Sequence, residues 1–89
     1  MTGKEISKQQ VQIMAVFIAE PQSWHSSPAV ALKAEVSGST VRHILLTLFT
    51  LEMLQRSDLF GGYRYRLSPT AKEQPYYKRI NEAAALLKT

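Results

Sequence analysis

The chain of 89 residues contains no cysteine, and its seven carboxylates and two histidines are scattered along it. The lack of cysteine excludes disulfide bonds, thiolate metal sites and a cysteine nucleophile. No apolar run reaches the roughly 20 residues that a helix needs to span a bilayer. The first eight residues also lack the apolar segment of a secretory signal. These absences favour a cytoplasmic protein without a membrane span, a metal or a cofactor.

Groups that could act together in catalysis are also lacking. The carboxylates belong to separate predicted elements, none of them pairs with a histidine, and there is no glycine-rich phosphate loop. His25 falls in a connector, where we expect an exposed or hydrogen-bonded loop residue rather than a metal ligand or a base. His43 falls on the outer face of a predicted helix. The sequence therefore predicts a protein that is not an enzyme.

The composition that is present is typical of a small basic globular protein. Hydrophobic residues make up 45% of the chain, which argues against disorder. The net charge of +4 and the isoelectric point near 9.6 favour an anionic partner. At this length we expect a single domain over residues 1–89, with residues 1–6 flexible.

Two helices are predicted in the first part of the chain. Ser7 and Gln10 match a capping box, so the first helix should run from Lys8 to Ala19 and end before Pro21. Its expected apolar stripe consists of Val11, Met14, Ala15 and Ile18, widened by Ile13 and Phe17. The second helix should cover residues 29–34, with Ser27 as the N-cap and Pro28 at the first position. We expect its core contacts to come from Val30, Leu32 and Val36.

A third helix with two different faces is predicted at residues 37–50. Its core face carries apolar residues at helical spacing, namely Val41, Ile44, Leu45 and Leu48. Its other face carries short or cationic hydrogen-bonding groups, namely Ser39, Thr40, Arg42, His43 and Thr47. We expect the Ser37 hydroxyl to cap this helix by accepting a hydrogen bond from a backbone N–H two or three residues later. The preceding tight turn has Glu35 where glycine is usual, because one turn residue needs a positive φ.

A β-hairpin should follow the third helix. Residues 63–67 alternate strictly, with Tyr63, Tyr65 and Leu67 on one face and Arg64 and Arg66 on the other. Because Gly61-Gly62 precedes them, they form the returning strand, and residues 53–56 form the outgoing strand. A short extended segment at Trp24 can pair with this hairpin. The two tyrosines should cover the core, although stacking on single-stranded bases is an alternative.

The remainder of the chain is predicted to be helical. A helical turn is expected at residues 70–73 and a final helix at residues 76–88. The final helix has an apolar stripe about two heptads long, formed by Tyr77, Ile80, Ala84 and Leu87 and widened by Ala83. The order of elements predicts an α+β fold that is mostly α: a winged helix-turn-helix with a two- or three-stranded wing and an extra C-terminal helix.

Residues 39–56 begin with Ser-Thr-Val and pass through a leucine-rich stretch into Leu54-Gln55-Arg56. This segment resembles the winged helix-turn-helix transcription regulators, and most closely the N-terminal DNA-binding domain of the IclR type. The segment Tyr65-Arg66-Leu67-Ser68-Pro69 is similar to the wing-to-helix junction of MarR- and PadR-type regulators. The resemblance covers residues 28–72. The chain departs from the family pattern where Glu35 and Glu52 replace glycine, and at the wing tip, where Leu59-Phe60 replaces charged residues.

The resemblance implies binding to double-stranded DNA, with helix 37–50 in the major groove and wing 53–67 on the flanking backbone. Arg42 is the expected base reader because its planar fork fits guanine. Ser39 and Thr40 suit a phosphate at the helix N-terminus. The full set of expected DNA contacts is Ser37, Ser39, Thr40, Arg42, His43, Thr47, Arg56, Arg64 and Arg66. We expect residues 38–47 and the arginine pair at 64 and 66 to form one continuous cationic surface.

Several alternatives stay open on the sequence alone. His43 could be a plain surface residue, and the three wing arginines could belong to a solvated sheet face. Leu46, Leu59 and Phe60 would also suit a protein-binding winged-helix adaptor or anti-regulator. The Leu59-Phe60 tip could instead fold onto the core or enter a minor groove as a wedge. An architectural or recombination accessory factor is a further alternative. For a regulator we expect a homodimer through residues 76–88, because one small module reads too few base pairs.

Overall fold

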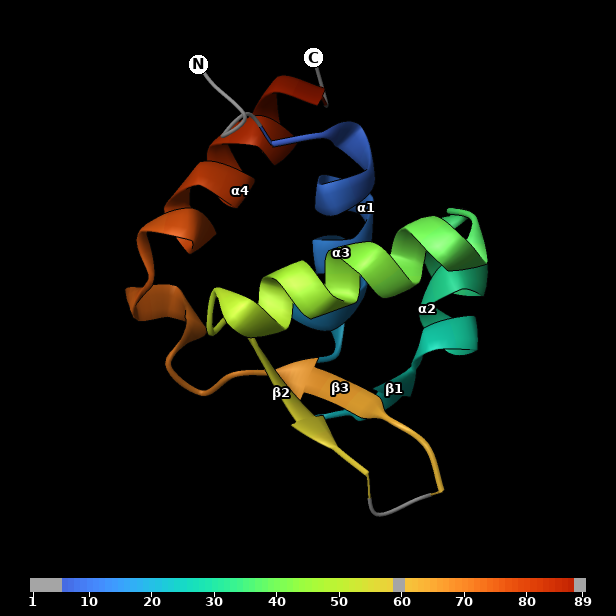
Figure 1. The fold of residues 1–89 in the computed structure, drawn as a ribbon. Coiled ribbons are helices and arrows are strands. Elements are labelled where there is room, and N and C mark those ends of the chain that lie inside the picture. The colour runs from blue at the N-terminus through green and yellow to red at the C-terminus, as the bar shows by residue number, and fades with distance from the viewer. Residues whose placement is uncertain (1–5, 59–60, 88–89) are drawn as a thin grey trace.

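The computed structural model describes residues 6–58 and 61–87 (Figure 1). Three helices form its first half: α1 (Lys8–Ala19), α2 (Ser27–Ala34) and α3 (Gly38–Thr50). Three short strands form a sheet: β1 (His25–Ser26), β2 (Leu54–Ser57) and β3 (Arg64–Leu67). A short 3₁₀ helix η1 (Ala71–Glu73) leads into α4 (Pro75–Leu87). The predicted fold class is confirmed: the chain is a mostly helical winged helix-turn-helix with a three-stranded wing and an additional C-terminal helix.

The sheet is antiparallel, with the strand order β1-β3-β2. In the register of the hairpin, Leu54 lies opposite Leu67 and Arg56 lies opposite Tyr65. On the other edge of β3, His25 lies opposite Tyr65, so the connector next to Trp24 does pair with the hairpin as expected. Both hairpin strands begin one residue later than predicted, because Met53 and Tyr63 precede the paired segments.

Helix α1 has the predicted bounds, because its capping box forms in full. The backbone N–H of Gln10 donates to Ser7 Oγ at 3.2 Å, and the N–H of Ser7 donates to Gln10 Oε1 at 2.9 Å. The buried stripe differs from the predicted one, because α1 packs against both α2 and α4. It consists of Val11, Ile13, Met14 and Phe17, whereas Ala15 is exposed and Ile18 is partly buried.

Helix α2 begins at Ser27, one residue before the predicted first helical position at Pro28. Its N-cap is Ser26 rather than Ser27, because Ser26 Oγ accepts the hydrogen bond from the N–H of Ala29 at 3.3 Å. The prediction that Leu32 is a core residue is wrong, since this side chain is 81% exposed. Val30 and Ala34 are buried one turn apart, and a residue midway between them projects from the opposite side of a helix.

Two glutamates adopt left-handed backbone conformations where glycine is usual. Glu35 ends α2 with φ 58°, and Glu52 follows α3 with φ 63°. The tight turn of the helix-turn-helix therefore keeps its geometry, and the backbone strain falls on Glu35. The positive φ that the sequence predicts for this turn is therefore found at Glu35.

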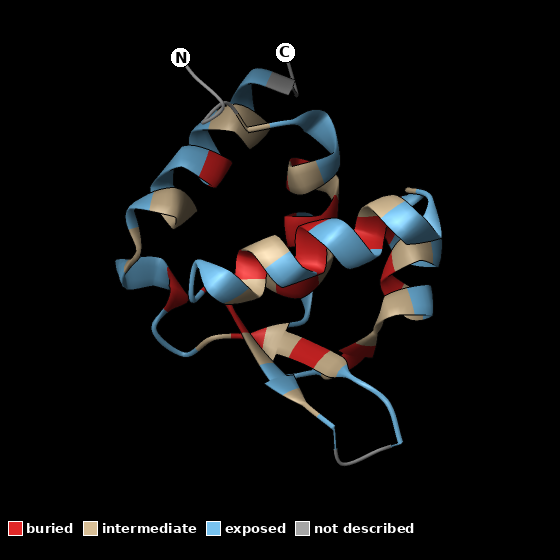
Figure 2. Cartoon of the chain, in the orientation of Figure 1, coloured by how far each residue is buried: buried red, intermediate tan, exposed pale blue. Residues whose placement is uncertain are grey.

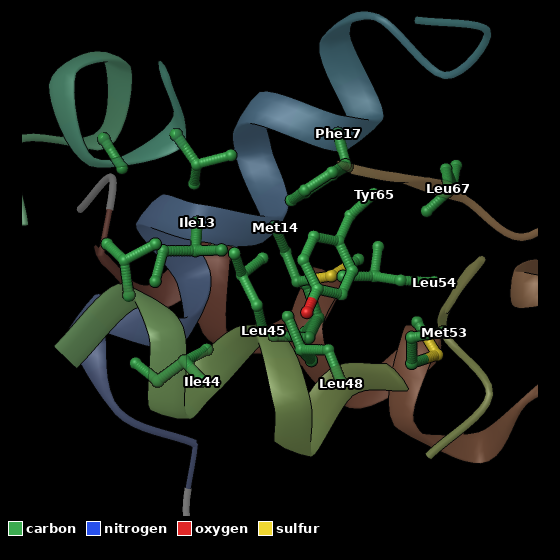
Figure 3. Close-up of a cluster of buried hydrophobic side chains, with 14 of the residues drawn as sticks. Ile13, Met14, Phe17, Ile44, Leu45, Leu48, Met53, Leu54, Tyr65 and Leu67 are labelled. Carbon is green, nitrogen blue, oxygen red and sulfur yellow. The ribbon is translucent and has the colours of Figure 1, made fainter. Parts of the chain in front are cut away.

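The core lies between α1, α3 and the sheet (Figure 3). All four predicted core residues of α3, Val41, Ile44, Leu45 and Leu48, are buried. Ile80 extends the core to α4. His25 is buried with 3% exposure, so the expectation of an exposed or hydrogen-bonded loop residue is wrong. Its ring meets Phe17 edge-on at 5.1 Å, because β1 places it between the sheet and α1.

Three further findings concern a membrane span, a metal site and the predicted segments that lie outside the described residues. Within residues 6–58 and 61–87, no helix is long and apolar enough to cross a bilayer. In the same ranges, histidine and acidic side chains form no group of three or more that could hold a metal ion. The predicted flexible segment 1–6 lies outside the described residues up to position 5, and so does the Leu59-Phe60 tip.

Candidate nucleic-acid interface

The outer face of α3 carries most of the polar residues that the sequence assigned to it. Because the residues at 41, 44, 45 and 48 point into the core, those between them point outward. Ser39, Arg42, His43 and Leu46 are exposed, and Thr40 and Thr47 are partly buried. Figure 2 shows exposed residues recurring along the side of α3 that is turned away from α1.

Several hydroxyl groups of α3 donate their hydrogen bonds within the helix. Thr47 Oγ1 donates to the carbonyl of His43 at 3.1 Å, and Thr50 Oγ1 donates to the carbonyl of Leu46 at 2.9 Å. The prediction that Ser37 caps the backbone is wrong, because its hydroxyl donates to Thr40 Oγ1 at 2.9 Å instead. The long donors that project from the face are therefore Arg42 and His43.

A groove of about 680 Å³ separates α3 from the hairpin. Arginines from three elements line it: Arg42 from α3, Arg56 from β2 and Arg64 from β3. The start of α2 forms one end, through Ser26, Ser27 and Pro28. Among the described residues that line the groove, none is acidic. The groove therefore concentrates positive charge and favours an anionic occupant.

Arg56 is held by two aromatic rings at the edge of this groove. Its Cζ lies 4.4 Å from the ring centroid of Phe49, near the end of α3, and 4.2 Å from that of Tyr63. Such cation–π contacts fix the guanidinium and connect the hairpin to α3. Tyr63 is exposed, so the expectation that it covers the core is wrong for this residue, whereas Tyr65 is buried as expected.

Arg66 makes contacts of its own with Gln55 and Trp24. Its Nε and Nη2 donate to Gln55 Oε1 at 3.2 and 2.7 Å, and its Cζ lies 4.5 Å from the ring centroid of Trp24. It does not line the groove of Arg42, Arg56 and Arg64. The expectation of one continuous surface that includes both wing arginines stays a prediction: Arg66 lines a second depression together with Arg56, where Gln55 and the neighbouring indole hold its guanidinium.

Sequence reasoning missed three contributors to this region. The start of α2 lines the groove, which follows from the close packing of α2 on α3 in a helix-turn-helix. Trp24 holds Arg66, and the only available signal was its position beside a segment that could pair with the hairpin. Gln55 could have been identified from the hairpin register, since it lies directly across from Arg66.

Comparisons with known proteins agree with this fold. A protein from Methanosarcina mazei Go1 described as a possible transcriptional regulator is 27% identical, with a TM-score of 0.68 over 90% of this chain and 71% of the other. A MarR family protein from Bacillus stearothermophilus is 17% identical, with a TM-score of 0.62 over 98% and 63% of the two chains. The zinc-responsive MarR family member ZitR of Lactococcus lactis is 20% identical, with a TM-score of 0.63 over 94% and 55%.

The predicted resemblance to winged helix-turn-helix regulators is confirmed by these structures, which support its MarR-like part. The IclR-type part stays a prediction. The similar structures are described as a possible transcriptional regulator and as MarR family proteins, in agreement with the non-enzymatic prediction. The chain spans 55% of the ZitR chain and 71% of the Methanosarcina chain. No protein-family model matches the chain, and a search of curated proteins found no match.

Proposed function

We propose that this winged helix-turn-helix protein, which shares its fold with MarR-family regulators, binds double-stranded DNA and regulates transcription. In this proposal α3 enters the major groove, and the hairpin of β2 and β3 contacts the flanking backbone. The observation that carries the proposal is the groove between α3 and the hairpin, with three arginines and no acidic residue among the described residues that line it. Phosphates and guanine edges are the groups that arginine forks recognise best in nucleic acids.

The roles of the individual residues follow from their positions. Arg42 reads a base, because it projects from the exposed face of α3 and its planar fork matches guanine. Ser39 and Thr40 contact a phosphate near the start of α3, where backbone N–H groups and the helix dipole favour an anion. Arg64 contacts the flanking backbone. Arg66 is left out of this set, since it does not line the groove between α3 and the hairpin.

A second candidate function is binding to a protein partner. It is favoured by exposed leucines near the groove, since Leu46 is 51% exposed and Leu32 is 81% exposed. Both lie beside Arg42, in depressions that this arginine helps to line. Because arginines line the groove and no acidic residue is among the described residues that line it, the groove favours binding to DNA rather than to an apolar protein surface. Retention on duplex DNA at low salt, compared with retention on a partner protein, separates the two functions.

The test is a titration of random duplex DNA at several salt concentrations. Neutralising roughly four to six phosphates per chain should give a slope of log affinity against log salt of about −4 to −5. Arg64→Ala should weaken binding to all duplexes alike and make the slope shallower by about one. Arg66→Ala should change the slope less. A binding curve that does not respond to salt would remove the DNA proposal.

Sequence preference requires a separate measurement with selected duplexes. Arg42→Ala should reduce the preference for the best sequence by about 1–3 kcal/mol, the usual discrimination of a bidentate base contact. Lys78→Ala serves as the control, because it removes one positive charge from the exposed side of α4 and leaves the groove intact. An unchanged preference in Arg42→Ala would show that Arg42 does not read a base.

A further inference from the structure

Leu46 is an apolar side chain in the middle of the polar face of α3. It is 51% exposed and lies one helical turn after Arg42, on the same side of the helix. Buried residues flank it in sequence, since Leu45 and Leu48 both point into the core. Packing therefore does not require a leucine at this position, and a polar residue would fit the helix equally well.

The surroundings of Leu46 distinguish it from an ordinary exposed leucine. It lines the same groove as Arg42, Arg56 and Arg64, so an apolar side chain and three arginines face one space. Thr50 lies one turn after Leu46, and its hydroxyl donates a hydrogen bond to the Leu46 carbonyl at 2.9 Å. This hydroxyl is therefore directed at the helix backbone. An anionic partner that occupies this groove can therefore also make an apolar contact with Leu46.

Double-stranded DNA has such a group in its major groove. The C5-methyl of thymine is the apolar feature that distinguishes its edge from those of the other bases. Residues four apart on a helix are separated by about 6 Å along the axis, which is roughly two base-pair steps of about 3.4 Å. A guanidinium at position 42 and an isobutyl group at position 46 can therefore contact base pairs of one site that lie about two steps apart.

We propose that Leu46 is a specificity residue that recognises the methyl group of a thymine about two base pairs from the guanine read by Arg42. This inference rests on the proposed DNA-binding function and deepens it by naming a base. The source of specificity is apolar contact, and the arginines around Leu46 supply the affinity. The contact is distinct from the protein-binding alternative, in which Leu46 would have no effect on DNA.

The experiment begins with selection of bound duplexes from random DNA by the full chain. The selected site should contain a thymine about two base pairs from a guanine. Replacing this thymine by deoxyuridine removes only the methyl group, whose burial contributes about 0.8 kcal/mol, so affinity should fall about fourfold. In Leu46→Ala the thymine and deoxyuridine duplexes should bind equally well.

The control is Leu51→Ala, which shortens an exposed leucine at the end of α3 that does not line the groove. It should keep the fourfold difference between the two duplexes. Equal affinities of the unaltered protein for both duplexes would overturn the inference, and so would a retained difference in Leu46→Ala. In either case a normal salt slope on random duplex would leave DNA binding itself intact, whereas loss of that slope would remove the proposed function.

Discussion

At the scale of single residues, the two glutamates with positive φ show how the fold overrides a local preference. Glu35 and Glu52 have φ angles of 58° and 63°, in a region where a side chain with a Cβ is strained by about 1–2 kcal/mol. Each follows a helix that has to end sharply, since the chain turns into α3 after Glu35 and into β2 after Glu52. Burial of the elements on both sides of each turn, α2 and α3 around Glu35 and α3 and β2 around Glu52, compensates for the local strain.

Replacing Glu35 by glycine should therefore stabilise the protein. Glycine relieves the left-handed strain and loses about 0.5–1 kcal/mol of that gain through the greater freedom of the unfolded chain. We expect the free energy of unfolding in urea to rise by about 0.5–1 kcal/mol in Glu35→Gly.

Two control variants test whether the change in stability comes from the backbone conformation at position 35, from the loss of the Glu35 charge, or from adding a glycine to the chain. Glu35→Gln removes the charge and keeps the Cβ, so it should leave the unfolding free energy nearly unchanged. Glu82→Gly places glycine inside α4 and should lower it by about 0.5–1 kcal/mol. A loss of stability in Glu35→Gly would mean that the left-handed turn is not strained.

Single residues also mark the limit of prediction from sequence. The outward position of Arg42 followed directly from the apolar periodicity of α3. The burial of His25 and the capture of Arg66 by Trp24 did not, because both depend on the pairing of β1 with β3. Contacts between segments that are distant in sequence cannot be derived from local periodicity or capping signals.

At the scale of elements, α4 is attached to the rest of the fold through a few buried side chains. Ile80 is buried in the core, and Tyr76 packs against it from the first turn. The Tyr76 hydroxyl is buried without a hydrogen-bond partner among the described residues. Burial raises the pKa of Tyr76 to about 12, and the nearby positive charge of Arg79 only partly opposes this.

This pKa predicts a loss of stability in alkali. An unfolded tyrosine ionises near 10.0, whereas folded Tyr76 ionises near 12, so the folded state retains its proton more tightly. The contribution of Tyr76 to stability is complete below pH 10 and is lost as the pH rises toward 12. Tyr76→Phe should therefore be less sensitive to alkali over this interval in urea unfolding experiments.

Tyr63→Phe is the matched control, because it removes the hydroxyl of an exposed ring. Its unfolding free energy should depend on pH between 10 and 12 in the same way as that of the unaltered protein. If Tyr76→Phe and Tyr63→Phe lost stability in parallel, ionisation of Tyr76 would not be coupled to the docking of α4.

The presence of each helix and strand was predicted more accurately than the residues at which it begins and ends. The bounds of α1 followed from the capping box at Ser7 and Gln10, which is a local signal. The start of α2 was misplaced, because Ser26 and Ser27 are chemically equivalent caps and only the path of β1 selects between them. The exposure of Leu32 was missed for a related reason, since a short alanine-rich helix has little periodicity of its own.

At the scale of the whole molecule, we propose that two copies associate through α4 and bind a palindromic site. The argument is that one module contacts too few base pairs to select a site in a genome. Leu86 is 75% exposed near the end of α4, and Ala83 and Ala84 are only partly buried. This end of α4 lies on the opposite side of the molecule from the hairpin in Figure 1, so association there leaves the groove open.

Sedimentation should therefore detect a dimer that depends on concentration. Leu86→Asp places a charge on the exposed face of α4 and should raise the dimer dissociation constant at least tenfold, about 1.4 kcal/mol. The same variant should lose affinity for a palindrome with half-sites about 34 Å apart and keep its affinity for one half-site. Leu51→Asp, at an exposed leucine outside α4, should leave the dimer unchanged. A monomer at all concentrations would contradict this assembly.

The position of Arg56 between Phe49 and Tyr63 has a consequence for the thermodynamics of complex formation. A hairpin that moved freely relative to α3 would lose conformational entropy on binding a duplex, and this loss would weaken the complex. Here the contacts of Arg56 with Phe49 and Tyr63 fix the spacing between α3 and the hairpin when the protein folds. In the proposed complex with DNA, the hairpin therefore keeps a preset distance from α3, and binding should carry a smaller entropic penalty than for a mobile hairpin.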